Sequence, residues 1–308
     1  MPLKDRLLAA LPFSRKELEL IIATAPFRYK QYKVPKRTPG SFRLLSQPTP
    51  EVKLIQRWVV GNEFRELPIH AAATAYRSGV GLVKNVEPHI TNRFLLKVDF
   101  KDFFPSIKAS DFVAFADQLG ISSYDIPTLI NILFKHDRSK RTMNLAIGAP
   151  SSPAISNLLL YPLDCALDEH CLTQGIKYTR YADDLSFSTN RPNQLKELEA
   201  ILPNIIDQSC PLRLEINKEK TVHTSKKNGR YITGLTITSQ NEISIGRTRK
   251  RLLRAQIDYF REKKLTEDEI KALKGYLSFL SSVEPSHIER LQAHYGLEIM
   301  ADLLSPQS

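Results

Sequence analysis

The sequence is poor in cysteine and has no long apolar run. Its three cysteines, Cys165, Cys171 and Cys210, form no CxxC pair. An odd number without that spacing argues against a disulfide framework or a zinc knuckle, so we expect a reducing, cytoplasmic location. No run of about 18 apolar residues occurs, which predicts no transmembrane helix. Residues 1–17 also lack the apolar core and cleavage site of a signal peptide.

The charge of the chain is strongly basic and unevenly distributed. The formal net charge is +11 over 308 residues, with 42% hydrophobic and 25% charged residues, as in ordinary folded proteins. Residues 1–58 carry a net charge of +8 and residues 247–264 carry +6, whereas the segment between them is nearly neutral. Two separated basic segments predict a polyanion such as nucleic acid held from two sides. Two merely solvated surfaces are the alternative.

Periodicity of apolar residues and turn signals predict a mixture of helices and strands. A basic β-hairpin is expected around the turn signal Thr38-Pro39-Gly40. Helices are expected over residues 14–24, 51–67, 109–120, 124–136, 154–174 with a kink at Pro162, 194–209, 246–264, 267–283 and 287–296. Strands are expected in 90–100, 177–189, 212–225 and 230–245. The last three helices form a natural C-terminal sub-domain.

Two adjacent carboxylates are the most informative feature of the sequence. Asp183 and Asp184 lie between two strand-like runs, where their like charges repel unless a cation offsets them. Asp99 is a third carboxylate, at the end of another strand-like run. Three such carboxylates can hold two Mg²⁺ ions about 3.5–4 Å apart, with Mn²⁺ as an alternative. A plain hairpin turn is the competing interpretation of Asp183 and Asp184.

The order of short motifs along the chain resembles that of reverse transcriptases. After Asp99 come residues 148–153 (GAPSSP), 181–184 (YADD), 217–221 (NKEKT) and Gly234. The resemblance implies an α+β fold, a right-hand polymerase with fingers, palm and helical thumb. It also implies RNA-directed DNA polymerase activity. The implied domains are an N-terminal helical segment (1–30), fingers (31–98), a palm (99–240) that includes a returning fingers segment (about 110–150), and a thumb (241–308).

Two further elements resemble retron reverse transcriptases in particular. Residues 85–89 (NVEPH) are similar to the NAxxH element, and residues 232–234 (ITG) are similar to the VTG element. This resemblance implies a structured non-coding RNA of the msr–msd type as template and 2′-hydroxyl primer. The product would be a branched RNA–DNA hybrid, multicopy single-stranded DNA (msDNA). A role in anti-phage defence with a co-encoded effector protein, and no membrane partner, are also implied.

The same resemblance assigns roles to individual residues. Asp99, Asp183 and Asp184 would bind the metal ions and catalyse nucleotide addition, with the Phe100 carbonyl as an extra ligand. Lys220 would lie near the leaving pyrophosphate, as a general acid or as a phosphate contact. Residues expected to bind the incoming deoxynucleotide are Lys36, Arg43, Phe103, Phe104 as a gate against ribose, and Gly148. Residues expected to bind RNA or primer are Asn85, His89, Thr233, Gly234, Arg247, Arg249, Lys250, Arg251 and Arg254.

Some residues depart from the family pattern or suggest other sites. Ile147 stands where many reverse transcriptases have Gln, so a side-chain amide contact to the nucleotide is not expected there. Asp164, Asp168 and His170 share a predicted helix, and we interpret them as a solvated helix face rather than a metal site. His89 is expected to contact RNA or to pin a turn.

Two other functions are compatible with the sequence. One is a group II intron-like or CRISPR-associated reverse transcriptase, which the neighbouring genomic DNA would distinguish. The other is a non-catalytic RNA-binding scaffold, which the intact set of Asp99, Asp183 and Asp184 argues against.

Overall fold

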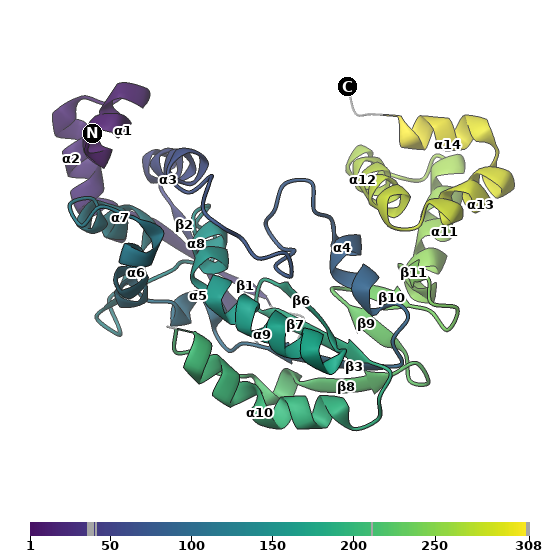
Figure 1. Cartoon of the computed structure of the whole chain (residues 1–308). Helices are drawn as coiled ribbons and strands as arrows, with labels where there is room; N and C mark the ends of the chain where they lie inside the picture. The colour runs from purple at the N-terminus through teal and green to yellow at the C-terminus, as the bar shows by residue number, and fades with distance from the viewer. Residues whose placement is uncertain (36–39, 41, 211, 306–308) are drawn as a thin grey trace.

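The centre of the molecule is a four-stranded antiparallel sheet with strand order β6-β7-β3-β8. The computed structural model describes residues 1–35, 40, 42–210 and 212–305. The strands of this sheet are β3 (Phe94–Asp99), β6 (Lys177–Tyr181), β7 (Asp184–Thr189) and β8 (Val222–Ser225). The N-terminal helices lie toward one end of the sheet and the C-terminal helices toward the other, as Figure 1 shows.

The N-terminal half is built from helices and two small hairpins. Its helices are α1 (Leu3–Ala10), α2 (Arg15–Thr24), α3 (Pro50–Asn62), α4 (Leu82–Val86), α5 (Phe103–Ser106), α6 (Ala109–Ala116) and α7 (Ile126–Leu133), with 3-10 turns at Ala25–Phe27, Glu87–His89 and Asp117–Leu119. The hairpins are β1 (Tyr29–Pro35) with β2 (Phe42–Pro48), and β4 (Lys135–Asp137) with β5 (Thr142–Asn144). Helix α2 begins with the expected capping box, in which Ser14 and Glu17 satisfy each other's backbone N–H groups.

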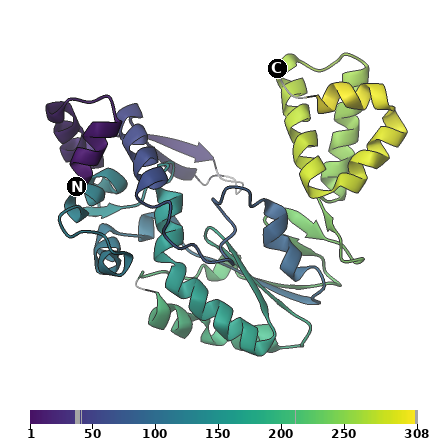
Figure 2. The same cartoon turned by 45° about the horizontal axis from the view of Figure 1, so that its top comes forward.

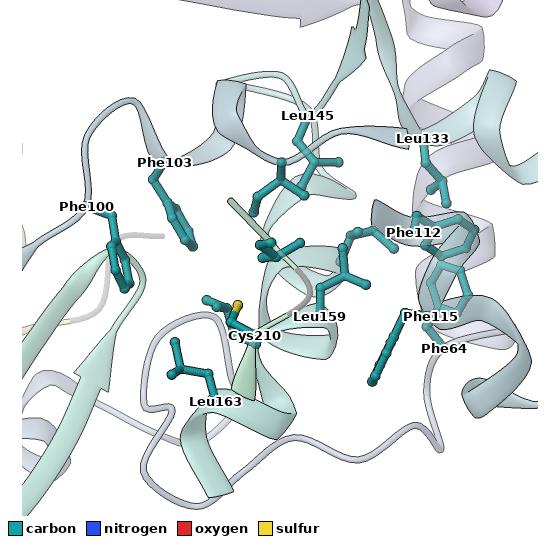
Figure 3. Packing of buried hydrophobic residues seen from close by; sticks show 14 of the residues in the cluster. Phe64, Phe100, Phe103, Phe112, Phe115, Leu133, Leu145, Leu159, Leu163 and Cys210 are labelled. Carbon is teal, nitrogen blue, oxygen red and sulfur yellow. The ribbon is translucent and has the colours of Figure 1, made fainter. Parts of the chain in front are cut away.

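One face of the central sheet packs on helices α8 (Ser152–Leu159), α9 (Tyr161–Gln174) and α10 (Gln194–Ser209). Leu96 and Val98 of β3 and Phe187 of β7 point into this core, which continues through the N-terminal helices. Figure 3 shows its aromatic part, where Phe112 and Phe115 lie near Leu159 and Leu133. The N-terminal half and the sheet therefore share one hydrophobic core.

A second hydrophobic core joins the C-terminal helices to the sheet. The helices are α11 (Arg247–Arg261), α12 (Glu267–Val283), α13 (Pro285–Tyr295) and α14 (Leu297–Leu304). They follow a three-stranded sheet of β9 (Arg230–Ile232), β10 (Leu235–Ile237) and β11 (Ile243–Ser244). Leu95 of β3 belongs to this second core, whereas the next residue, Leu96, belongs to the first. Figure 2 shows the C-terminal helices as a separate bundle beyond the palm.

Most predicted elements are present, although several of their bounds differ and further short helices occur. The expected helix 124–136 ends at Leu133, because Lys135–Asp137 pairs with β5 as a strand. The expected kinked helix at Pro162 is two helices, since Pro162 lies in the first turn of α9, where its missing N–H costs nothing. The expected strand 212–225 shrinks to Val222–Ser225. A fourth C-terminal helix, α14, follows the three that were expected.

Candidate active site

Strand pairing brings the three predicted carboxylates to one end of the sheet. Asp99 is the last residue of β3 and lies opposite Asp184, the first residue of β7. Asp183 precedes it in a tight turn, in which Ala182 has a left-handed backbone with φ of 58°. The Asp183 carbonyl accepts a hydrogen bond from the Phe100 N–H at 3.3 Å, which ties the turn to β3. The carboxylates therefore come together through backbone pairing.

The segment before β8 surrounds Asp99 with donors. The Lys220 ammonium lies 2.7 and 3.0 Å from the two carboxylate oxygens of Asp99. The Asn217 side-chain amide donates to Asp99 at 3.3 Å, and the Asn217 backbone N–H donates to the Asp99 carbonyl at 2.7 Å. Lys220 is 60% exposed, so its cation reaches the site from the solvent side. This lysine therefore adjoins the predicted metal-binding carboxylates; its own catalytic role stays a prediction.

The carboxylates repel one another, and this is visible in their pKa values. Burial and the charges of Asp183 and Asp99 raise the pKa of Asp184 to about 6. Burial, followed by the charge of Asp99, also raises the pKa of Asp183. The pKa of Lys220 is raised because its hydrogen bond and attraction to Asp99 outweigh its partial burial. The site therefore favours additional positive charge.

The donor set suits a hard divalent cation. Asp99, Asp183 and Asp184 offer carboxylate oxygens, which bind Mg²⁺ or Mn²⁺ in preference to softer metals. Within the described parts of the chain, no three His, Cys, Asp or Glu side chains form a ready-made ligand cluster. Because Asp99 is paired with Lys220 here, cation binding would require this ammonium to yield its place at the carboxylate.

The buried side chain of Arg180 hydrogen-bonds to the backbone of the acidic turn. The Arg180 guanidinium donates to the Ala182 carbonyl at 3.0 Å and to Asn157 at 3.1 Å. It also forms a two-point pair with Asp164 of α9, and the Tyr178 hydroxyl donates to the same carboxylate at 2.7 Å. The prediction that Asp164 lies on a solvated helix face is wrong, because its side chain is fully buried. Sequence reasoning missed Arg180, although it directly precedes the YADD motif.

Comparison with known proteins identifies the family. Residues 34–237 match the family described as reverse transcriptase (RNA-dependent DNA polymerase). The chain is 37% identical over 285 residues to the retron Ec83 reverse transcriptase of Escherichia coli, covering 91% of each chain. It is 32% identical over 295 residues to the retron Ec86 reverse transcriptase of the same organism, covering 93% of this chain and 88% of that one. The chain belongs to the retron reverse transcriptases.

A structural relative supports the fold of this reverse transcriptase. A telomerase from Candida albicans, solved with a fragment of telomeric RNA, matches with a TM-score of 0.50 at 14% identity. The match covers 94% of this chain and 63% of the telomerase. The expected right-hand α+β fold is thereby confirmed, as is the RNA-directed DNA polymerase activity of the family. Family membership also implies a divalent metal cofactor.

Phe104 and Phe103, both predicted to bind the incoming nucleotide, lie in different surroundings. Phe104 is half-buried, and its ring centroid lies 6.4 Å from that of Tyr76. Tyr76, which sequence reasoning missed, is 50% exposed with φ of 63°, and burial and the Asp183 charge raise its pKa. Phe103 is instead 4% exposed and stacks on Phe100 at 6.2 Å. Its predicted contact with the nucleotide is therefore wrong in this conformation, and its ring belongs to the core.

The basic hairpin of β1 and β2 bears on the predictions for Arg43, Lys36 and Gly148. Arg43 is exposed on β2, and its charge favours the ionised form of Asp183. Lys36 lies outside the described residues. Gly148 has φ of 105°, and a Cβ there would lie 3.0 Å from the Leu45 side chain. In this structure, Gly148 therefore permits a close approach of its segment to strand β2 of this hairpin. Its expected close approach to nucleic acid stays a prediction.

In the retron-like element 85–89, Asn85, Val86 and His89 are buried, whereas Glu87 and Pro88 are exposed. His89 lies between the Ser188 and Thr179 hydroxyls, at 2.7 Å from Nδ1 and 2.9 Å from Nε2. Asn85 accepts a hydrogen bond from the Thr74 hydroxyl at 3.0 Å. Both side chains are 0% exposed, so the expected RNA contact through them is wrong in this conformation. They pin the α4 segment to the face of the sheet opposite α9 and α10, the alternative predicted for His89.

The predicted RNA-binding residues of the thumb divide into two groups. Arg247, Arg251 and Arg254 are exposed along α11. Arg249 instead donates to the Gly234 carbonyl at 2.8 Å, and Lys250 pairs with the buried Glu284 at 2.5 Å. Thr233 lies in the turn between β9 and β10 and has a left-handed backbone, with φ of 47°. Arg249 therefore ties helix α11 to the turn between β9 and β10, and Lys250 ties the same helix to the junction of α12 and α13 within the thumb. The exposed arginines remain available for phosphate.

One further observation concerns the helices. In the portion of the chain that the structure describes, none is long and apolar enough to span a membrane.

Proposed function

We propose that this retron reverse transcriptase copies a structured non-coding RNA that also supplies the priming 2′-hydroxyl group. DNA would start from the 2′-oxygen of a guanosine, giving the branched hybrid of msDNA. Similarity to the Ec83 and Ec86 retron enzymes along nearly the whole chain supports this choice over a group II intron-like or CRISPR-associated enzyme. The proposed catalytic function rests on one observation, that Asp99, Asp183 and Asp184 meet at one end of the palm sheet.

We propose Mg²⁺ as the working cofactor, with Mn²⁺ as a substitute, held by Asp99, Asp183 and Asp184 and by the Phe100 carbonyl. A bound metal pair would supply activation of the primer hydroxyl and stabilisation of the leaving pyrophosphate. Arg180 holds the backbone of the acidic turn in place through the Ala182 carbonyl. Lys220, once displaced from Asp99 by the metal ions, would face the triphosphate as general acid or phosphate contact.

Other residues of the chain would select and hold the substrates. The Phe104 ring, beside Tyr76, would exclude a ribose 2′-hydroxyl by its bulk, and Arg43 would pair with the triphosphate. The exposed arginines of α11, together with the turn at Thr233 and Gly234, would contact RNA or the primer strand. The domain limits remain those predicted, with fingers over 31–98, the palm over 99–240 and the thumb from 241.

The deciding experiment is to purify the protein from its native host and to sequence the nucleic acid that accompanies it. We expect one structured RNA and a DNA strand joined to it, which a debranching enzyme separates. A random RNA pool without attached DNA would contradict the retron function. RNA binding without any DNA synthesis would favour the non-catalytic scaffold. A co-encoded effector, an anti-phage role and a cytoplasmic location belong to the same proposal.

A further inference from the structure

A groove outside the active site lies between the two hairpins of the fingers. It has a volume of about 510 Å³ and is lined by Phe27, Gln31, Leu44, Lys135, His136 and Arg138, among others. The hairpins meet there, where the Lys135 ammonium donates to the Ser46 hydroxyl at 3.1 Å. A volume of this size is typical of sites for small ligands or single nucleotides.

The groove opens on the side of the β1–β2 hairpin that faces away from the carboxylates. Successive side chains of a strand point to opposite faces, so Arg43 and Leu45 share one face, and Leu44 and Ser46 share the other. Arg43 acts on Asp183, and Leu45 packs against Gly148. Leu44 lines the groove. The groove is therefore distinct from the proposed nucleotide-binding side of the fingers.

The groove offers an aromatic surface to solvent. The Phe27 side chain is 56% exposed, although an aromatic ring of this size is normally buried. Its ring centroid lies 4.9 Å from that of His136, which backs it from within the protein. His136 Nδ1 is buried and, among the described residues, has no hydrogen-bond partner. An exposed aromatic ring backed by a second ring suits a flat heterocycle that stacks on it.

The surroundings of the ring are cationic. Residues 135–141 contain Lys135, Arg138, Lys140 and Arg141 but only one acid, Asp137. The Asp137 carboxylate already accepts hydrogen bonds from the Ser139 N–H and hydroxyl at 3.0 and 2.7 Å. Lys135 is half-buried, so its charge acts in a medium that screens it less than water does. The groove therefore combines one stacking surface with several cations, as single-stranded nucleic acid requires.

We propose that this groove binds an unpaired nucleotide of the partner RNA, with its base stacked on Phe27 and its phosphate contacted by Lys135 and Arg138. The inference rests on the proposed RNA partner and adds a second contact, separate from the thumb arginines. A paired base is not accessible for stacking, so the site selects unpaired segments of the RNA. The groove would hold one RNA segment against the fingers while another segment occupies the active site.

Binding of a short labelled oligouridine to the full-length protein tests the proposal. We expect Phe27→Leu combined with Arg138→Gln to weaken this binding by roughly tenfold or more, the usual effect of losing one stacked base. The slope of affinity against salt should fall by about 0.7 for the lost phosphate contact. Affinity for blunt duplex RNA should stay at the wild-type value. Each single variant should show part of the loss.

Matched controls are available on the same half of the molecule. Tyr124 is 70% exposed and Arg65 is also exposed, and neither lines the groove. Tyr124→Leu combined with Arg65→Gln should therefore bind oligouridine as the wild type does. An equal loss in this control, or no loss in the groove variant, would overturn the proposal. So would competition by polyglutamate as effective as by unlabelled oligouridine, which would indicate an acidic protein as partner.

The outcomes for the groove and for the proposed function can be told apart. A wild-type protein that carries no specific RNA and makes no DNA would contradict the retron function itself. A wild-type protein that makes branched DNA, beside a groove variant that binds oligouridine normally, would contradict only the groove.

Discussion

The guanidinium of Arg180 grips the carboxylate of Asp164 at two points, with distances of 2.8 Å from Nε and 2.6 Å from Nη2. Both side chains are 0% exposed, and the remaining Arg180 nitrogen holds the Ala182 carbonyl. A salt bridge on α9 thus determines where the turn before Asp183 lies. The ion pair fixes the position of the turn. It need not raise the free energy of unfolding, because a buried ion pair need not stabilise a protein relative to apolar residues.

Replacing Arg180 by Met should therefore impair both folding and catalysis. The variant leaves the Asp164 carboxylate buried without its partner, which typically costs about 3–5 kcal/mol of unfolding free energy. Urea denaturation measures this loss, and primer extension measures the activity. Lys84→Ala, which breaks the exposed pair of Lys84 with Glu87, is the control and should change little. A similar small change in both variants would contradict the positioning role. Arg180→Lys should restore stability only in part, since lysine lacks the two-point geometry.

The buried His89 should make stability depend on pH. Burial lowers the pKa of His89 to about 3, whereas an unfolded chain titrates near 6.5. Between these values the unfolded state binds a proton that the folded state does not, so unfolding free energy decreases as pH falls from about 6.5 toward 3. Urea titrations at neutral and mildly acidic pH should show a smaller pH effect for His89→Gln than for wild type. The exposed His294→Gln should behave as wild type, and identical pH profiles for all three proteins would refute this account.

The two carboxylates of the YADD turn should be indispensable for synthesis. We expect Asp183→Asn with Asp184→Asn to abolish Mg²⁺-dependent DNA synthesis, because amides do not replace carboxylates as metal ligands. Gel-shift affinity for RNA should persist, since the exposed arginines of α11 are unaffected. The exposed Asp117→Asn is the matched control and should keep its activity. Undiminished synthesis by the double variant would remove the catalytic assignment.

The gate role of Phe104 predicts a change in sugar selectivity. Phe104→Ala should raise ribonucleotide incorporation relative to deoxynucleotide by about tenfold or more, because the bulk that excludes the 2′-hydroxyl is gone. Steady-state incorporation of both substrates measures the ratio. Phe103→Leu changes the buried neighbour and should lower stability while leaving selectivity as it was. Unchanged selectivity in Phe104→Ala would show that the gate lies elsewhere.

Two substitutions of Lys220 separate its two candidate roles. Lys220→Met removes the charge beside Asp99 and should slow synthesis in either case. Lys220→Arg keeps a cation but not a proton donor of suitable acidity, since arginine stays protonated. If the lysine is a general acid, the arginine variant should be slowed by about 10²–10⁴-fold, as for loss of general acid–base catalysis. Near-normal rates for Lys220→Arg would identify a phosphate contact, and normal rates for both would exclude either role.

The meeting of the three carboxylates was predictable because their positions follow from local rules. Asp99 ends an apolar run and Asp183 and Asp184 fill a turn, so antiparallel pairing of these strands brings them together. The capping box at Ser14 and the basic hairpin are equally local. Such features depend on neighbours in the sequence or on one register of strands.

The errors concern residues whose role depends on distant parts of the chain. Asp164 looks like a solvated acid until Arg180 is placed against it. Asn85 and His89 belong to a motif that suggests RNA, yet the Asn85 side chain bonds to Thr74 and His89 bonds to strands β6 and β7. The cations at residues 135–141 did not stand out in the sequence, because the long segment between residues 58 and 247 is nearly neutral as a whole. Long-range burial and short charge clusters are invisible to composition over wide windows.

The alternation of Leu95 and Leu96 between two cores has a further consequence for β3. A slip of this strand by one residue would exchange the two leucines and would expose each core to the polar side chains beside them. Such a slip would also move Asp99 away from Asp184. Packing in both hydrophobic cores therefore strongly disfavours a sheet with this shifted register. A cavity made by Leu95→Ala, on the thumb side, is therefore expected to loosen the alignment of carboxylates that it never contacts.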